Sequence, residues 1–285
     1  MPKICVITDT DSSLPEEMAA AYHILQVPIS IHLDDDYSGT DLTIDNAALF
    51  KKIDAVGKLP TTAAPNPALF VEYFKKVFKE EKPDTLIYFA ISSEMSATIK
   101  SARTAAEELD DLDIRVIDSN TLSMAQGYMV LAAAEAAQNG ASIETVIQTA
   151  EKVRERTYLY GALSTLKYLS MSGRVSHIAA GMAGMLAIKP ILSVQNGKLA
   201  MLEKVRTRSK SWLRMIELVQ VDVDDHPIER VSILHVNDTA GARAFEKLLR
   251  ERLDCPKHIP LVDINPGLSV HTGAGLVGIC LVVDK

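Results

Sequence analysis

The sequence is poor in several residue types that mark specialised classes of protein. Its 285 residues include three cysteines, one tryptophan and only 5% aromatic side chains. Cys5, Cys255 and Cys280 are far apart and form no CxxC pair. The sequence therefore predicts neither a disulfide framework nor a zinc site, and we interpret the three cysteines as reduced thiols of the core.

Positive charge and long apolar runs are also scarce. The 30 Lys and Arg residues are outnumbered by 37 Asp and Glu, which gives a formal net charge of -7. Because affinity for nucleic acids comes mostly from Lys and Arg neutralising phosphates, this balance argues against a nucleic-acid partner. The longest weakly polar stretch, 178–188, is far shorter than the ~20 residues that span a bilayer. With no signal-peptide pattern at the N-terminus, we expect a cytoplasmic protein without stable membrane insertion.

What the chain does have is the length and pattern of a two-domain α/β protein. It is 47% apolar and 24% charged, and 285 residues are more than one core usually needs. In the first half, β-rich runs alternate with amphipathic stretches, which predicts a parallel, Rossmann-like sheet. The pattern changes near residue 157. We therefore expect one domain at 1–157 and a second, mixed α/β domain at 158–285.

Local signals predict where several elements begin and end. Ser13 and Glu16 have the spacing of a capping box, and Asn66 followed by Pro67 should open a helix. Gly57 should close one, and Asn196-Gly197 should form the turn of a hairpin. Among the other assignments are a single strand at 24–33, a turn region at 167–176 and a helix at 178–188.

A cluster of hydroxyl side chains lies where a strand is expected to meet a helix. Residues 89–102 read FAISSEMSATIKSA, with Ser92 and Ser93 at the strand end and Ser96 and Thr98 at the helix start. Ligands of parallel α/β folds bind at the carboxyl edge of the sheet, and the N–H groups of a helix N-terminus favour anions. This position suits an anionic head group, although serines also cap helices without any ligand.

Three further segments carry groups that could bind a ligand. Thr61 and Thr62 stand between prolines in another loop that leads into a helix. His271 precedes Gly273-Ala274-Gly275 near the C-terminus, where glycines let the backbone turn tightly around a ligand. The string at 273–278 matches GxGxxG, but too few residues follow it for a dinucleotide fold. Arg174 follows Ser172-Gly173, and arginine is the preferred partner of phosphate or carboxylate.

In chain order, these segments resemble the DegV family of bacterial fatty-acid-binding proteins. The resemblance is carried by five motifs: TDTDSSLP at 8–15, PTTAAP at 60–65, SSEMSAT at 92–98, SGRV at 172–175 and VHTGAG at 270–275. The positions that match the family pattern are Thr62, Ser93, Arg174, His271, Gly273 and Gly275. The departures are Ala63 and Ala64 for Ser-Gln, Ala97 and Ser172 for Gly, and Ala274 for Pro. They bear on the finer hydrogen bonding of the head-group site and on ligand preference.

The resemblance implies a two-domain carrier of one fatty acid. The carboxyl group would lie at the domain junction, and the acyl chain would be buried in the C-terminal domain. Relatives serve as the lipid-carrying subunit of a fatty acid kinase, whose separate ATP-binding subunit is related to dihydroxyacetone kinases. That subunit phosphorylates the bound carboxyl group, and the acyl phosphate enters phospholipid synthesis. No cofactor, metal or catalytic residue of the carrier itself is implied.

Site roles follow from the resemblance and from the chemistry of a carboxyl group. Thr62 and Ser93 would bind it through neutral hydroxyls, which leave its oxygen reactive toward a phosphoryl group. His271 would add a hydrogen bond. Further contacts would come from Thr61, Ser96 and Gly273, whereas Arg174 would meet the kinase subunit or its phosphates at the pocket mouth.

Three alternatives stay open at the level of sequence, of which a purely structural or interaction role is the least favoured because the hydroxyls are clustered. A serine hydrolase could use Ser93 and His271, although no GxSxG elbow is present and no aspartate is marked as the third member of a triad. The protein could also bind another anionic amphiphile or a small phosphorylated compound, because a helix N-terminus favours any anion.

Overall fold

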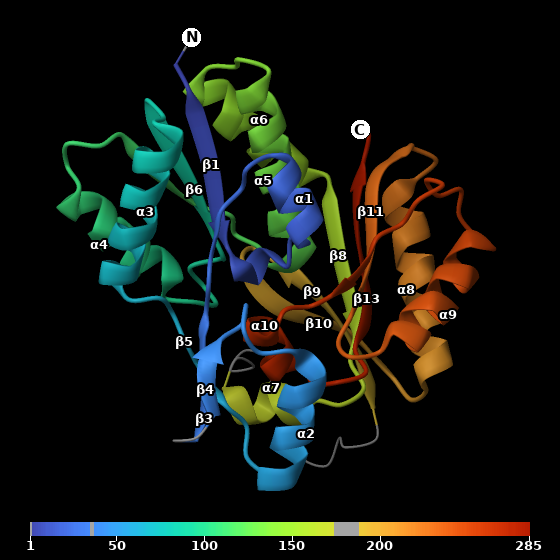
Figure 1. Ribbon diagram of the computed structural model, residues 1–285. Helices are drawn as coiled ribbons and strands as arrows, with labels where there is room; N and C mark the ends of the chain where they lie inside the picture. Colours follow the sequence, from blue (N-terminus) through green and yellow to red (C-terminus); the bar gives the residue numbers. More distant parts are fainter. Residues whose placement is uncertain (1, 35–36, 174–187) are drawn as a thin grey trace. The chain divides into compact units, whose positions relative to one another are not determined.

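A computed structural model describes residues 2–34, 37–173 and 188–285 (Figure 1). By their contacts the residues group into two units, and each is described by itself. Unit 1 is Met1–Ser30, Thr62–Glu155 and Asn196–Lys198, and unit 2 is Ile31–Thr61, Arg156–Gln195 and Leu199–Lys285. The division at Glu155 lies next to the boundary expected near residue 157, but two other segments change unit. Because grouped contacts do not measure independent folding, the domains 1–157 and 158–285 stay a prediction.

Unit 1 is built on a four-stranded parallel sheet with the order β2–β1–β6–β7. Its strands are β1 (Ile4–Asp9), β2 (Gln26–Val27), β6 (Thr85–Ala90) and β7 (Ile114–Asp118). Every residue of the apolar strand β6 is buried, as is usual at the centre of a parallel sheet. Ala90 pairs with Asp118, so β6 and β7 end at the same edge. The parallel sheet expected for the first half is confirmed.

Helices of unit 1 pack on both faces of this sheet. They are α1 (Glu16–Ala21), α3 (Pro67–Glu81), α4 (Thr98–Glu108), α5 (Ser123–Gln138) and α6 (Ile143–Glu155), with a 3₁₀ helix η1 (Thr10–Ser12). Figure 1 shows α3 and α4 on one side of β1 and β6, and α5 on the other. The apolar stripe of α3 buries Phe70 and Phe74 against Tyr88 of β6. This apolar core lies between the helices and the strands, and polar residues follow the strand ends.

The start of α1 differs from the expected capping box. Ser13 has φ 50°, in the left-handed region, and ends η1. An N-cap needs an extended backbone, so Ser13 cannot cap Glu16, and α1 begins after Pro15 without a side-chain cap. The other two helix signals are confirmed. Asn66 accepts a hydrogen bond from the Leu69 N–H at 2.8 Å, and Gly57 closes α2 (Asn46–Val56) with φ 70°.

Unit 2 contains a mixed six-stranded sheet with the order β10–β9–β8–β13–β11–β12. Its strands are β8 (Thr157–Ala162), β9 (Lys189–Gln195), β10 (Lys198–Val205), β11 (Ile228–His235), β12 (Leu261–Asp263) and β13 (Val277–Val283). The central pairs β8–β13 and β13–β11 are antiparallel, whereas β11–β12 is parallel. Asn196 and Gly197 both have positive φ, which confirms the expected turn between β9 and β10. The mixed sheet of the second half is confirmed.

Two long helices, α8 (Arg208–Val223) and α9 (Thr239–Arg250), lie on one side of β11 and β13 (Figure 1). They bury Met215, Ile216 and Phe245 against Ile233 and Ile279. In addition, α7 (Lys167–Ser172) occupies the start of the expected turn region 167–176, so that prediction is wrong there. Contact with α10 (Pro266–Thr272) and full burial of Leu169 stabilise this short helix.

The single strand expected at 24–33 is also wrong, because it is interrupted at Pro28. Proline has no N–H to donate to a ladder, and the chain changes sheets there. Before it, β2 pairs with β1. After it, β3 (Ser30–Asp34) joins β4 (Tyr37–Thr40) and β5 (Thr61–Ala63) in a three-stranded sheet of order β4–β3–β5. None of the helices in the described ranges is long and apolar enough to cross a membrane.

Candidate ligand-binding site

The serine cluster lies at the carboxyl edge of the parallel sheet, on the loop from β6 to α4. We call residues 91–97 the serine loop. Three consecutive N–H groups at its start donate to acceptors inside unit 1. Ile91 donates to the Asp9 carboxylate at 2.9 Å and Ser92 to the Thr121 carbonyl at 2.9 Å. Ser93 donates to both carboxylate oxygens of Asp118 at 3.3 Å.

The next three N–H groups are used within the loop itself. Those of Met95 and Ser96 donate to the Ser92 carbonyl, and that of Glu94 donates to the Ser92 hydroxyl. All amides from 91 to 96 therefore have partners, and two of the acceptors are carboxylates. The anion-binding helix N-terminus expected at this junction is thus not formed by these amides. The N-cap of α4 is Ala97, which makes no side-chain cap, although Ser96 Oγ accepts the Thr98 N–H at 3.3 Å.

Three of the four hydroxyls are also engaged. Ser92 Oγ is buried and donates to the Gly197 carbonyl at 2.7 Å, while Ser96 Oγ and Thr98 Oγ1 bond each other at 2.8 Å. Ser93 differs, because its side chain is exposed and its hydroxyl makes no hydrogen bond within the described residues. Of the cluster, the structure therefore leaves the Ser93 hydroxyl available to a ligand.

The hairpin turn that receives Ser92 belongs to unit 1 even though it is distant in sequence. Gly197 has φ 76°, and a Cβ built there would lie 2.7 Å from Ser92 Oγ. The side chain of Lys198 pairs with Glu94 at 3.1 Å. Glycine thus permits the turn to approach the serine loop closely.

A buried polar network beneath the serine loop was not anticipated from the sequence. Asp9, which is 0% exposed, accepts hydrogen bonds from the Tyr88 hydroxyl at 2.7 Å and from Gln126 Nε2 at 3.0 Å, besides the Ile91 N–H. Burial, followed by the adjacent Asp9 carboxylate, raises the pKa of Tyr88 well above its usual range. The signal in the sequence is Asp9 itself, a carboxylate directly after an apolar strand.

The two threonines of the second motif lie on β5, where the division between the units falls between them. Within unit 2, Thr61 Oγ1 donates to the His32 carbonyl at 3.2 Å. This bond keeps the Thr61 hydroxyl in the small sheet. Thr62 belongs to unit 1 and is half-buried.

His271 lies in the last turn of α10, and not in the glycine-rich loop where the sequence indicated it. Gly273 ends that helix with φ 83° and ψ 158°, a conformation that only glycine adopts readily. A Cβ there would overlap the ring of Tyr168. Gly275, with φ 81°, and the carbonyl of Ala274 face Ser164, whose hydroxyl donates to that carbonyl at 2.7 Å.

Asn46 anchors α10 and was also missed from the sequence. It donates to Asp263 Oδ1 at 2.9 Å and to the Ile264 carbonyl at 2.7 Å, and it accepts a bond from the Ser269 hydroxyl. These contacts join residues more than 200 positions apart, so the sequence around Asn46 does not predict them.

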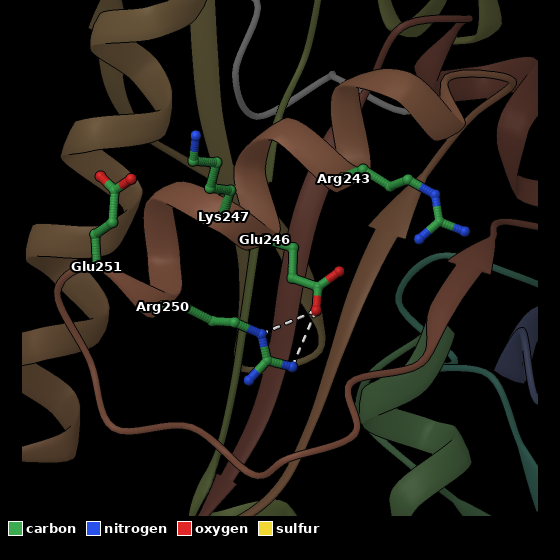
Figure 2. A pocket seen from close by; sticks show the side chains of 5 residues that line it. All are labelled: Arg243, Glu246, Lys247, Arg250 and Glu251. Carbon is green, nitrogen blue, oxygen red and sulfur yellow. Dashed lines mark hydrogen bonds and ion pairs between the residues drawn. The ribbon is translucent and has the colours of Figure 1, made fainter.

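Other parts of the expected site fall elsewhere. Arg174 and residues 178–187 lie outside the described residues. Two hollows of unit 2, of about 410 and 630 Å³, contain none of the family motifs. Figure 2 shows the smaller one, on the charged face of α9, where Arg250 bonds Glu246. In the described part of the chain no cluster of side chains could hold a metal ion.

Comparison with known proteins identifies the family of this chain. A model of the DegV family, described as uncharacterised proteins, matches residues 3–284. The chain belongs to the DegV family. A DegV domain-containing protein of Mycobacterium tuberculosis is 34% identical over 288 residues, which cover 98% of this chain and 97% of that protein.

Solved DegV structures share the whole fold. One from Thermus thermophilus, described by its fatty acid binding, has a TM-score of 0.90 at 25% identity. Another from Bacillus subtilis, described as a fatty acid binding protein, has a TM-score of 0.87 at 28% identity. Each match covers 100% of both chains. The expected DegV family and α/β fold are therefore confirmed.

Proposed function

We propose that this DegV chain binds a long-chain fatty acid, whose carboxyl group accepts a hydrogen bond from the Ser93 hydroxyl. DegV proteins described as binding fatty acids match the chain over its full length. The observation within the chain that carries the proposal is the available hydroxyl of Ser93, beside Ser92 and Ser96 hydroxyls that are already bonded.

The electrostatics of the serine loop favour a weak anion over a phosphate. Phosphate sites gather several unengaged N–H groups or a positive side chain. Here the amides of 91–96 are occupied, and the Ser93 N–H faces the carboxylate of Asp118. A single neutral donor suits a carboxyl group, and this supports a fatty acid over the small phosphorylated compound considered as an alternative.

Most of the affinity is expected from the acyl chain. Burial contributes about 0.8 kcal/mol per CH₂, so a dozen methylenes supply roughly 10 kcal/mol before ordering costs. The head group therefore needs to add little, and loss of one hydrogen bond should weaken binding by about three- to tenfold.

In this proposal the chain also acts as a carrier of the bound fatty acid. The chain would present the carboxyl group to a separate ATP-binding kinase subunit, which forms the acyl phosphate, and it would not be catalytic itself. Thr62, His271 and Gly273 stay candidates for further contact with the carboxyl group, and Arg174 for contact with the kinase or its phosphates. Thr61 and Ser96 stay candidates as well, with hydroxyls that are hydrogen-bonded within the protein.

Native mass spectrometry of the purified protein, followed by lipid rebinding after extraction, tests the proposal. We expect a co-purified long-chain acid. Ser93→Ala should weaken rebinding about three- to tenfold, as expected for one hydrogen bond, whereas Ser96→Ala should change it little. Absence of any bound or rebinding fatty acid would reject the function. Equal effects of the two variants would reject the assigned role of Ser93.

Phosphate transfer needs its own measurement. Incubation with a dihydroxyacetone-kinase-like subunit, ATP and the loaded protein should yield acyl phosphate, trapped with hydroxylamine as the hydroxamate. The same unengaged hydroxyl makes Ser93 the residue to watch for the hydrolase alternative. A fluorophosphonate probe that labels Ser93 would favour a serine hydrolase over a carrier.

A further inference from the structure

We propose that Asp118 is a positioning residue for Ser93. This inference rests on the proposed function, in which the Ser93 hydroxyl binds the carboxyl group of a fatty acid. Asp118 does not touch the ligand in this proposal. Its carboxylate holds the N–H of Ser93 and thereby fixes the direction in which the Ser93 side chain points.

The pairing of β6 with β7 continues beyond the regular ends of the two strands. In the ladder between β6 and β7, the last backbone pair is Ala90 with Asp118. Beyond it, the Ser119 N–H donates to the Ala90 carbonyl at 3.0 Å and the Ser92 N–H donates to the Thr121 carbonyl at 2.9 Å. These bonds carry the pairing of the two segments past the regular strands, up to Ser92.

Asp118 extends this pairing by one more residue. Both of its carboxylate oxygens lie 3.3 Å from the Ser93 nitrogen. The carboxylate is itself held by the Asn120 N–H at 2.8 Å, where Asn120 has φ 51°. The side chain thus acts as a fixed acceptor at the point where the backbone of β7 has already turned away.

Because Asp118 holds the N–H of Ser93, it restricts the direction of the Ser93 side chain. The peptide before Ser93 is oriented by Asp118, and the peptide after it by the bond from the Glu94 N–H to Ser92 Oγ. With both neighbouring peptides held, the Cα–Cβ bond of Ser93 has one direction. The exposed hydroxyl is then presented without competing partners among the described residues.

A set of variants separates this role from a merely structural one. Asp118→Ala removes both contacts of the carboxylate. Asp118→Ser keeps a hydroxyl that can accept the Asn120 N–H in a local turn, but it is too short to reach Ser93. Asp118→Asn keeps an acceptor oxygen at full length. Asp118 is partly exposed, so these substitutions leave the core unchanged.

The readout is fatty acid affinity, measured by titration of delipidated protein with a fluorescent long-chain acid. Because one hydrogen bond to Ser93 is at stake, we expect Asp118→Ala and Asp118→Ser to weaken binding about three- to tenfold. Asp118→Asn should restore most of the affinity. In the Asp118→Ser, Ser93→Ala double variant, the loss should equal that of Ser93→Ala alone, because the two residues act as one unit.

The outcomes distinguish failure of the positioning role of Asp118 from failure of the proposed fatty acid site. If Ser93→Ala weakens binding while Asp118→Ser does not, or if the two losses multiply in the double variant, the positioning role is overturned and the fatty acid site stands. If Ser93→Ala itself has no effect, the head-group assignment fails and the inference fails with it. If Asp118→Ala unfolds, the Ser and Asn variants still decide.

Discussion

The serine loop of unit 1 and the segment 271–277 of unit 2 both carry DegV motifs, yet they are held by different forces. In the serine loop, consecutive N–H groups are bonded by side-chain and backbone acceptors. In the second segment, Gly273 adopts a conformation closed to other residues, so that the ring of Tyr168 packs where a Cβ would stand. A hydrogen-bonded loop should lose stability in small steps, whereas a sterically defined one should fail at a single atom.

The sharpest test of this difference is Gly273→Ala. The new Cβ would overlap Cδ2 of Tyr168, on a backbone with φ 83° and ψ 158°. We expect the free energy of unfolding to fall by about 4 kcal/mol, from backbone strain together with overpacking. Urea denaturation followed by circular dichroism measures it.

Gly57→Ala provides a comparison at a glycine with a milder backbone conformation, φ 70° and ψ 16°. Gly57 also has positive φ, at 70°, but no atom lies within 4 Å of the position that a Cβ would take there. Only the left-handed backbone is then unfavourable, which costs about 1–2 kcal/mol. Similar losses for the two variants would show that conformation alone, and not the contact with Tyr168, sets the glycine requirement.

The largest effect in the serine loop should come from Asp9→Ala. It removes the acceptor of two buried donors, the Ile91 N–H and the Tyr88 hydroxyl, and one of the three acceptors of Gln126 Nε2. Unsatisfied buried groups are costly, and we expect a loss of about 3 kcal/mol in the free energy of unfolding. Asp110→Ala, an exposed aspartate of the same unit, should change it by less than about 0.5 kcal/mol. A small effect of Asp9→Ala would mean that water replaces the carboxylate.

The raised pKa of Tyr88 predicts that the free energy of unfolding depends on pH in the alkaline range. Its pKa is raised in the folded protein, so below about pH 10 both states keep the proton and the stability is intact. Above that pH the unfolded tyrosine ionises first. The free energy of unfolding should then fall by at most about 1.4 kcal/mol per pH unit from this group. Urea midpoints across this range should fall more steeply for the parent than for Tyr88→Phe, and parallel curves would contradict the shift.

Sequence patterns captured the sheets because local periodicity and turn residues report on local structure. The helix ends at Asn66 and Gly57 and the turn at Asn196-Gly197 are set by neighbouring residues, and they were predicted correctly. Pro28 marks the opposite case, because a continuous apolar run concealed a change of sheet at a residue that cannot donate to a ladder.

The candidate site was only partly predictable, because its decisive contacts are distant in sequence. The motif indicated Ser93, but which amides and hydroxyls are already engaged depends on pairs such as Ile91 with Asp9 and Ser92 with Gly197, separated by 82 and 105 positions. The amides at 91–96 looked available for an anion. They are not, because acceptors distant in sequence, at Asp9, Asp118 and Thr121, bond the first three amides and Ser92 bonds the rest. No pattern near Ser93 encodes the distant acceptors.

The smallest expected effect concerns what holds the hairpin turn to the serine loop. The ion pair of Lys198 with Glu94, at 3.1 Å, joins side chains that are 44% and 46% exposed, so solvent and salt screen it. Glu94→Gln should lower the free energy of unfolding by less than about 0.5 kcal/mol, and by less still in concentrated salt. Ser92→Ala should cost about 1–2 kcal/mol, because it leaves the buried Gly197 carbonyl without its donor. If Glu94→Gln lowered the free energy of unfolding more than Ser92→Ala, the exposed ion pair, and not the buried hydroxyl, would hold the turn against the serine loop.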